Sequence, residues 1–231
     1  MFGYYSMDLS YFLVLLPLFI LSVWASRNVN STYEKYSQIG NSRGLSGAQV
    51  AEMILRANGI TNVRVEMTGG HLTDHYHPRD HVIRLSQSVY YGQSMAAVGV
   101  AAHEAGHAVQ YAKGYIPVRL RTLILPAVQF SNKWTMVLMF IGLILGFYQL
   151  AVAGLILFGV VTFFQFVTLP VEFNASRRAL AALENHIGLD RQDVEGAGKV
   201  LRAAALTYVA AFAISLAQLL RFVAMINRRR R

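Results

Sequence analysis

The uncharged stretch over residues 134–169 constrains the fold of this chain more than any other feature. It contains 36 consecutive residues without Asp, Glu, Lys or Arg, in a chain that is 55% hydrophobic. A single helix of that length would run for about 54 Å, well beyond a hydrocarbon core of about 30 Å. Two apolar helices joined by a tight turn fit better, and the polar residues Tyr148 and Gln149 mark the expected turn within residues 146–154. We therefore predict a transmembrane hairpin over residues 134–169.

Two further apolar stretches lie near the ends of the chain. Residues 9–25 carry no charge and no clear cleavage site follows them, which predicts a retained membrane anchor over residues 1–26 rather than a cleaved signal peptide. The stretch over residues 203–226 is interrupted only by Arg221, and it predicts a C-terminal apolar helix that ends in the basic tail 228–231. The expected fold is a mainly α-helical integral membrane protein with three or four transmembrane helices, a polar region over residues 27–133 and a helical segment over 170–202.

The motif HExxH at residues 103–107 lies in a stretch, 94–113, that we predict to be helical, with Ser94 as N-cap and Gly114 just after its end. Positions i and i+4 of a helix share one face, so His103 and His107 can bind one Zn²⁺ together. Glu104 would then act as the general base on a zinc-bound water. The simpler alternative is a pair of core histidines whose hydrogen-bond partners are other side chains.

The segment before this helix predicts a small β-sheet. Residues 62–67 and 81–85 alternate apolar and polar side chains, as half-exposed strands do, and residues 77–80 suit a turn. A short helix is expected over residues 46–58. Polar and aromatic side chains crowd the segment between the strands, namely His71, Asp74, His75, Tyr76, His77 and His81. We predict His75 and Tyr76 as catalytic residues that stabilise an oxyanion, and a solvated hairpin for His77 and His81; a second metal site in this cluster stays open.

A catalytic zinc site takes three protein ligands, so a third ligand is needed on the same side of the membrane. The predicted hairpin returns the chain to that side near Pro170, and Glu172 is the expected ligand, at the start of a helix just beyond the span. A glutamate placed there only to complement the helix dipole is the alternative, at about 0.5 kcal/mol. Asp190 and Asp193 predict the start of a further helix.

Four segments resemble the YugP-like neutral zinc metallopeptidases of bacterial membranes, and together they span nearly the whole chain. They are residues 70–76 (GHLTDHY), 100–110 (VAAHEAGHAVQ), 169–179 (LPVEFNASRRA) and 205–211 (ALTYVAA). More distantly, HExxH followed by Glu-Phe-x-Ala is similar to the HtpX-type and CAAX-prenyl membrane proteases. The resemblance implies a zincin-like core of the gluzincin type with Glu172 as third ligand. In those distant families an Asp supports the site where this chain has Ser176. For Tyr208, a place near the site and a place at the membrane interface both stay open.

These observations together predict a membrane-embedded zinc metalloendopeptidase that acts on peptides or membrane proteins. The alternative is a non-catalytic zinc-binding scaffold or adaptor, which would have no need of Glu104. The net charge of +9 would also suit nucleic-acid binding, but the basic residues are dispersed, so we expect lipid bilayer rather than nucleic acid as the partner. Eleven Lys and Arg residues between positions 27 and 133 predict a cytoplasmic catalytic side, although the basic tail conflicts with this if the last stretch crosses. No motif specifies a homo-oligomer, and the absence of Cys excludes thiolate ligands.

Overall fold

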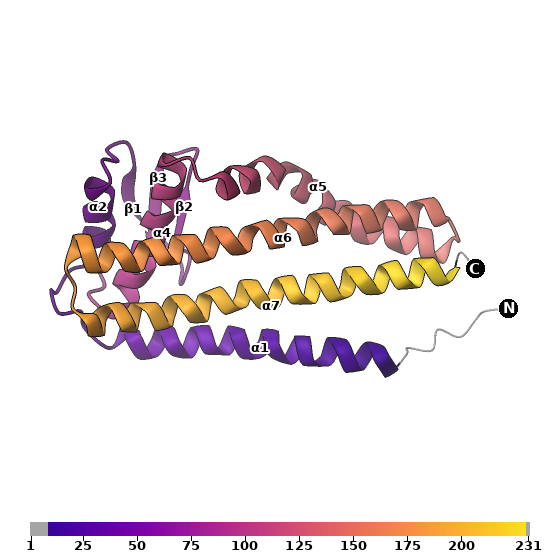
Figure 1. The fold of residues 1–231 in the computed structure, drawn as a ribbon, viewed down its shortest axis with the longest axis horizontal. Coiled ribbons are helices and arrows are strands. Elements are labelled where there is room, and N and C mark those ends of the chain that lie inside the picture. Colours follow the sequence, from indigo (N-terminus) through magenta and orange to yellow (C-terminus); the bar gives the residue numbers. More distant parts are fainter. Residues whose placement is uncertain (1–8, 230–231) are drawn as a thin grey trace. The chain divides into compact units, whose positions relative to one another are not determined.

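A computed structural model describes residues 9–229 of the chain, which is mainly helical with one small sheet (Figure 1). The chain divides into two compact units. We call residues Arg27–Leu120 and Thr168–Leu206 the polar unit. The remaining described residues, 9–26, 121–167 and 207–229, form the apolar unit.

The sheet of the polar unit has three strands, β1 (Arg64–Thr68), β2 (His75–His77) and β3 (Val82–Ser86), in the order β1-β3-β2. The central strand β3 pairs parallel with β1 and antiparallel with β2, and four of its five side chains are buried. The two predicted strands and the turn before β3 are confirmed to within two residues. The third strand, β2, was not predicted, because three residues are too few to show alternation. It forms one edge of the sheet.

The helices that pack on this sheet begin and end where their capping residues predict. In α2 (Gly47–Ala57), Ser46 and Gln49 form a capping box. In α4 (Met95–Ala112), which contains HExxH, the Ser94 hydroxyl accepts from the backbone N–H of Ala97, and Gly114 has a φ of +64° just beyond the end. The short helix α3 (Gln87–Tyr90) joins β3 to this segment. Side chains of α2, α4 and β3 form one buried core.

Four long helices complete the chain: α1 (Leu9–Ser37), α5 (Ile116–Ile144), α6 (Tyr148–Ala182) and α7 (Arg191–Arg229), with one π-helical turn η1 (Leu183–Ile187) after α6. The turn of the predicted hairpin lies earlier than expected, at residues 145–147, because Gly146 adopts a φ of +73° there. Tyr148 and Gln149 instead begin α6. The start of α7 is confirmed, since the Asp190 carboxylate accepts from the backbone N–H of Asp193.

The helix start expected at Pro170 was wrong, because α6 continues through Pro170 without a break. A proline inside a helix removes one backbone hydrogen bond, the one its own N–H would have donated. That loss is one bond in a helix of 35 residues. The carbonyl of Pro170 lies 3.5 Å from the Tyr115 hydroxyl, which donates to it. Glu172 therefore lies inside a long helix rather than at the start of a new one.

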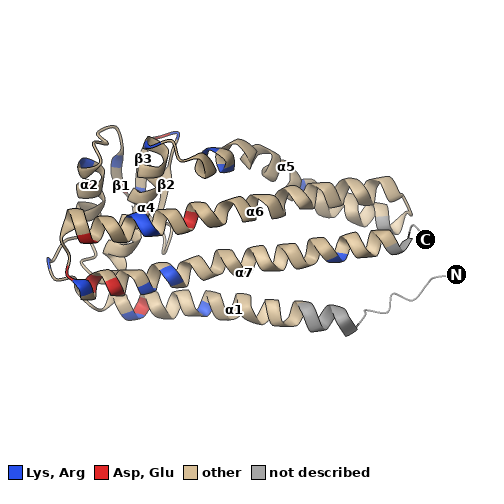
Figure 2. Cartoon of the chain, viewed as in Figure 1, with Lys and Arg blue, Asp and Glu red and all other residues tan. Residues whose placement is uncertain are grey.

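The apolar unit presents large hydrophobic side chains at its surface. Phe19, Phe140 and Ile156 are each more than 60% exposed, and few charged residues colour these parts of the helices in Figure 2. Exposed apolar surface of this extent marks a membrane or partner interface. Within residues 9–229, two helices are long and apolar enough to cross a membrane, over Tyr148–Ile187 and Arg191–Asn227. The structure thus supplies two candidate spans, fewer than the three or four predicted.

Candidate metal centre and general base

The imidazoles of His103 and His107 lie one turn apart on α4, with ring centroids separated by 4.7 Å. Helix α6 brings the buried carboxylate of Glu172 to the same place, with Oε2 at 3.3 Å from Nε2 of His103 and 3.5 Å from Nε2 of His107. One donor atom from each of the three residues falls within 4.8 Å of the others. The structure therefore brings together the three predicted ligands. No second such group of His, Asp and Glu is found among residues 9–229.

Small residues let α4 and α6 approach closely enough for this convergence. A Cβ added to Gly106 would lie only 2.7 Å from the carbonyl oxygen of Ala175. Ala102 and Ala105 on α4 are fully buried and add little bulk. The glycine inside the HExxH motif thus sets the spacing between the helix with both histidines and the helix with Glu172.

Two imidazoles and one carboxylate are the protein ligands of one class of catalytic zinc sites, so the donor set fits Zn²⁺. The electrostatics of these side chains agree with cation binding. Burial alone would lower the pKa of His107, but the hydrogen bond that the imidazole donates to Glu172 and the charges of Glu104 and Glu172 outweigh it and raise that pKa above its ordinary value. The carboxylates thus attract positive charge to this imidazole, and a bound divalent cation would supply that charge in place of the proton.

A polar side chain also contacts the Nδ1 atom of each imidazole. The Ser176 hydroxyl lies 3.1 Å from Nδ1 of His103, and Oε1 of Gln110 lies 3.0 Å from Nδ1 of His107. Ser176 therefore contacts a predicted ligand, His103. Gln110 was not predicted, because a lone glutamine in an apolar helix matches no motif. Its spacing, three residues after His107, was the available signal.

The carboxylate of Glu104 is buried beside the predicted ligands and is held by a backbone group. The N–H of Tyr76, on the edge strand β2, donates to Oε2 of Glu104 at 2.9 Å. The Tyr76 ring packs against Tyr111 with centroids 5.5 Å apart, and burial together with Tyr111 raises the pKa of its hydroxyl. His75 is exposed, with Nδ1 at 2.7 Å from the Thr73 carbonyl. The contact from β2 to Glu104 is therefore made by the Tyr76 backbone.

Asp74, just before β2, accepts hydrogen bonds from the last residue of β3. Its Oδ1 accepts from the backbone N–H of Ser86 at 2.7 Å and from the Ser86 hydroxyl at 3.0 Å. Ser86 is fully buried, so these bonds satisfy groups that water does not reach. His77 pairs with Asp80 at 3.2 Å, and both side chains are more than 40% exposed. The solvated turn expected there is consistent with this exposure.

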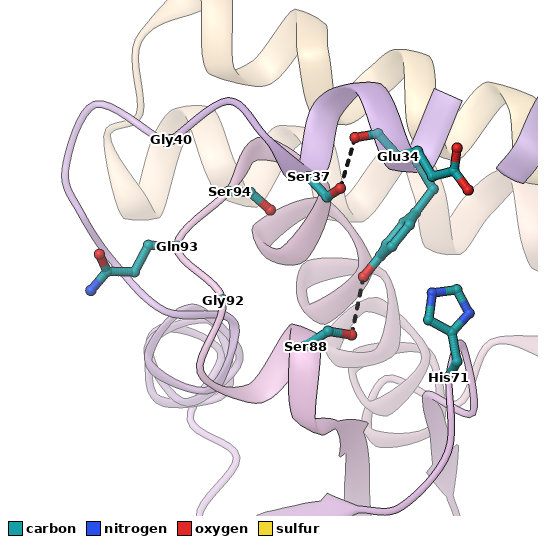
Figure 3. A pocket seen from close by; sticks show the side chains of 9 residues that line it. Glu34, Ser37, Gly40, His71, Ser88, Gly92, Gln93 and Ser94 are labelled. Atoms are coloured by element: carbon teal, nitrogen blue, oxygen red, sulfur yellow. Dashed lines mark hydrogen bonds between the residues drawn. The ribbon is translucent and has the colours of Figure 1, made fainter. Parts of the chain in front are cut away.

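A cavity of about 470 Å³ lies elsewhere in the polar unit, beside the C-terminal turns of α1 (Figure 3). Tyr33 lines it, with its hydroxyl 3.4 Å from that of Ser88. The His71 ring contacts the Tyr33 ring edge-on, with centroids 5.8 Å apart. None of the predicted zinc ligands lines this cavity, and His71 lies here rather than at the metal centre.

Comparison with known proteins shows that this chain is similar to a described protein family and to a named bacterial protein. The family described as "Putative neutral zinc metallopeptidase" matches residues 11–227. The protein named "Putative membrane protease YugP" from Bacillus subtilis (strain 168) is 48% identical over 203 residues, which cover 88% of this chain and 90% of that protein. No solved structure gives a significant match.

Proposed function

Because the chain belongs to this family of neutral zinc metallopeptidases, we propose that it is a zinc-dependent metalloendopeptidase that hydrolyses peptide bonds. The observation that carries the proposal is the position of Glu104. Its buried carboxylate lies beside a convergent set of two imidazoles and one carboxylate, and a site that only bound zinc would not need it. His103, His107 and Glu172 are the proposed zinc ligands.

When bound there, zinc supplies Lewis acidity, which polarises the scissile carbonyl and increases the acidity of a water molecule. Glu104 takes a proton from the attacking water as the new carbon–oxygen bond forms. It then donates that proton to the leaving amine as the carbon–nitrogen bond breaks. The Tyr76 N–H holds Oε2 of Glu104, which orients the carboxylate and leaves its other oxygen for the proton.

Tyr76 and His75 remain proposed stabilisers of the oxyanion. The position of Tyr76 supports this better than that of His75, because its backbone already contacts Glu104 whereas the His75 ring is exposed. For either residue the substrate would have to bring its carbonyl to the side chain.

The proposed setting is a multi-pass membrane enzyme with three or four spans that cleaves peptides or membrane proteins. The two candidate spans and the exposed apolar side chains of the apolar unit support a bilayer as partner. The count of basic residues over positions 27–133 supports a cytoplasmic catalytic side. The basic tail over residues 228–231 would favour the opposite side if the last stretch crosses, and Arg230 and Arg231 lie outside the described residues. We propose no nucleic-acid partner, and a homo-oligomer is compatible with this function.

The test compares detergent-purified wild type with Glu104→Gln and Glu172→Ala. Zinc content is measured by elemental analysis and turnover with an internally quenched peptide library. Glu104→Gln should keep about one zinc per chain while turnover falls at least 10²-fold, since general acid–base catalysis contributes about 10²–10⁴. Glu172→Ala should lose the zinc. Glu184→Gln, which changes an exposed glutamate, is the matched control and should behave like wild type.

Wild-type turnover in Glu104→Gln would refute the mechanism. Zinc-loaded wild-type protein that cleaves neither the library nor denatured membrane proteins would favour the scaffold alternative.

A further inference from the structure

Gln110 is a fully buried polar side chain that joins the two helices of the metal centre. On one side, its Oε1 lies 3.0 Å from Nδ1 of His107. On the other, its Nε2 donates to the backbone carbonyl of Val171 at 2.8 Å and to Oδ1 of Asn174 at 3.0 Å. Val171 and Asn174 flank Glu172 on α6. One amide thus contacts a predicted ligand on α4 and the segment that carries another on α6.

The partners of Gln110 determine which way its amide points. The Val171 carbonyl can only accept a hydrogen bond. The Asn174 Oδ1 also accepts from Nε of Arg178 at 2.8 Å, and a guanidinium can only donate, which fixes the orientation of the Asn174 amide. Both groups therefore require the Gln110 NH₂ to face α6, so its carbonyl oxygen must face His107.

This orientation has a consequence for the imidazole. A carbonyl oxygen can only accept, so Nδ1 of His107 has to carry the proton in the contact with Gln110. In the neutral ring, Nε2 then holds the free lone pair, and Nε2 is the atom that lies near Glu172. The partner of His103 differs, because the Ser176 hydroxyl can donate or accept and imposes no tautomer.

We propose that Gln110, oriented by Asn174 and Arg178, is a positioning residue that fixes the Nδ1–H tautomer of His107 and presents its Nε2 to the metal. These hydrogen bonds join α4 to α6, so Gln110, Asn174 and Arg178 also help to hold Glu172 at its distance from the histidines. The inference rests on the zinc site of the proposed function and not on peptide hydrolysis.

The experiment measures zinc affinity by chelator competition on the full chain in detergent, without substrate. Gln110→Met keeps the length of the side chain but removes its hydrogen bonds to His107 and to α6, and it should weaken zinc binding about 10- to 100-fold, as loss of the hydrogen-bond partner of a metal-binding histidine typically does. Asn174→Leu should also weaken zinc binding, whereas Asn174→Asp keeps the acceptor and should stay within about threefold of wild type. Arg178→Met should fall between these, and Arg177→Met, which changes the exposed neighbour, should match wild type.

A second readout separates tautomer control from a purely structural role. In metal-free protein with ¹⁵N-labelled histidine, long-range ¹H–¹⁵N spectra should assign the neutral His107 ring as Nδ1–H in wild type and as a mixture in Gln110→Met. If Gln110→Met does not fold, Asn174→Leu serves for the same comparison. Wild-type zinc affinity in Gln110→Met, or an unchanged tautomer in either variant, would overturn the proposal. Failure of the proposed function would be visible separately, as wild-type protein that binds zinc and cleaves no peptide.

Discussion

Gly106→Ala tests whether the contact between α4 and α6 sets the geometry of the metal centre. The new Cβ would lie 2.7 Å from the Ala175 carbonyl oxygen, whereas ordinary contact begins at 3.4 Å. The helices must therefore separate by about 0.7 Å, the difference between these distances, because the neighbouring atom belongs to the backbone and cannot rotate away. A productive site tolerates displacements of about 0.5 Å, so the expected shift is large enough to weaken zinc binding.

The same substitution has two opposing effects on stability. Forcing extra volume into a packed core costs about 1–3 kcal/mol. Replacing a glycine inside a helix by alanine contributes up to about 1 kcal/mol in the other direction. We expect the overpacking to prevail, with a net loss of up to about 2 kcal/mol. Gly198→Ala is the matched control, because its nearest atom is the mobile end of Arg202 at 3.2 Å, and it should stabilise the helix.

The assay combines thermal unfolding followed by circular dichroism in detergent with zinc affinity from chelator competition. Gly106→Ala should unfold below wild type and bind zinc at least tenfold more weakly, and Gly198→Ala should do neither. If Gly106→Ala unfolded above wild type and bound zinc equally well, the helices would be free to separate without affecting the site. The reasoning from the close approach would then be refuted.

Two further predictions concern the edge strand and the protonation of the site. Asp74→Ala leaves the buried N–H of Ser86 without its acceptor, so unfolding free energy should fall by about 1–3 kcal/mol and turnover should decrease as β2 loosens around Glu104; Asp80→Ala, in an exposed ion pair, is the control, and equal unfolding curves for the two variants would contradict this role. His107 must lose its proton to bind zinc, and its pKa is raised above 6.5, the ordinary value for histidine. As the pH is lowered, zinc affinity should therefore start to fall before pH 6.5 is reached. In the protein without zinc, the contact of protonated His107 with Glu172 stabilises the fold at low pH, and this stabilisation is lost as pH rises through the raised pKa. Competition titrations between pH 5 and 9 check this, and a decline confined to values below 6.5 would contradict it.

The elements that could be predicted are those whose sequence signals lie within a few residues of the element itself. Ser46 with Gln49 and Ser94 with Gly114 mark helix ends through caps formed within a few residues, and HExxH defines its own helical face. The convergence of Glu172 with His103 and His107 was also expected, because its chemistry completes a ligand set that two histidines leave unfinished. The approach of α4 to α6 that permits it depends on Gly106, whose importance the sequence does not reveal.

The features that sequence reasoning missed depend on contacts between distant residues. Strand β2 pairs with β3 beside a hydrogen bond from Ser86 to Asp74, twelve residues away, and no local alternation marks so short a strand. The continuity of α6 through Pro170 contradicts the usual effect of proline. The sequence points to the side chains of His75 and Tyr76, whereas the contact with Glu104 is made by a backbone N–H, which any residue except proline could supply at that position.

The separation of the ligands along the chain has a consequence for biosynthesis. Glu172 follows His103 by 69 residues, and the intervening chain includes the uncharged stretch 134–169. At a synthesis rate of about 5–20 residues per second, the ribosome needs roughly 3–14 s to pass from the first ligand to the third. During that interval the nascent protein has both histidines and the proposed general base Glu104, but it lacks the third proposed ligand. If Glu172 completes the zinc site as proposed, the order of synthesis delays zinc binding by all three ligands until the uncharged stretch 134–169 has been made.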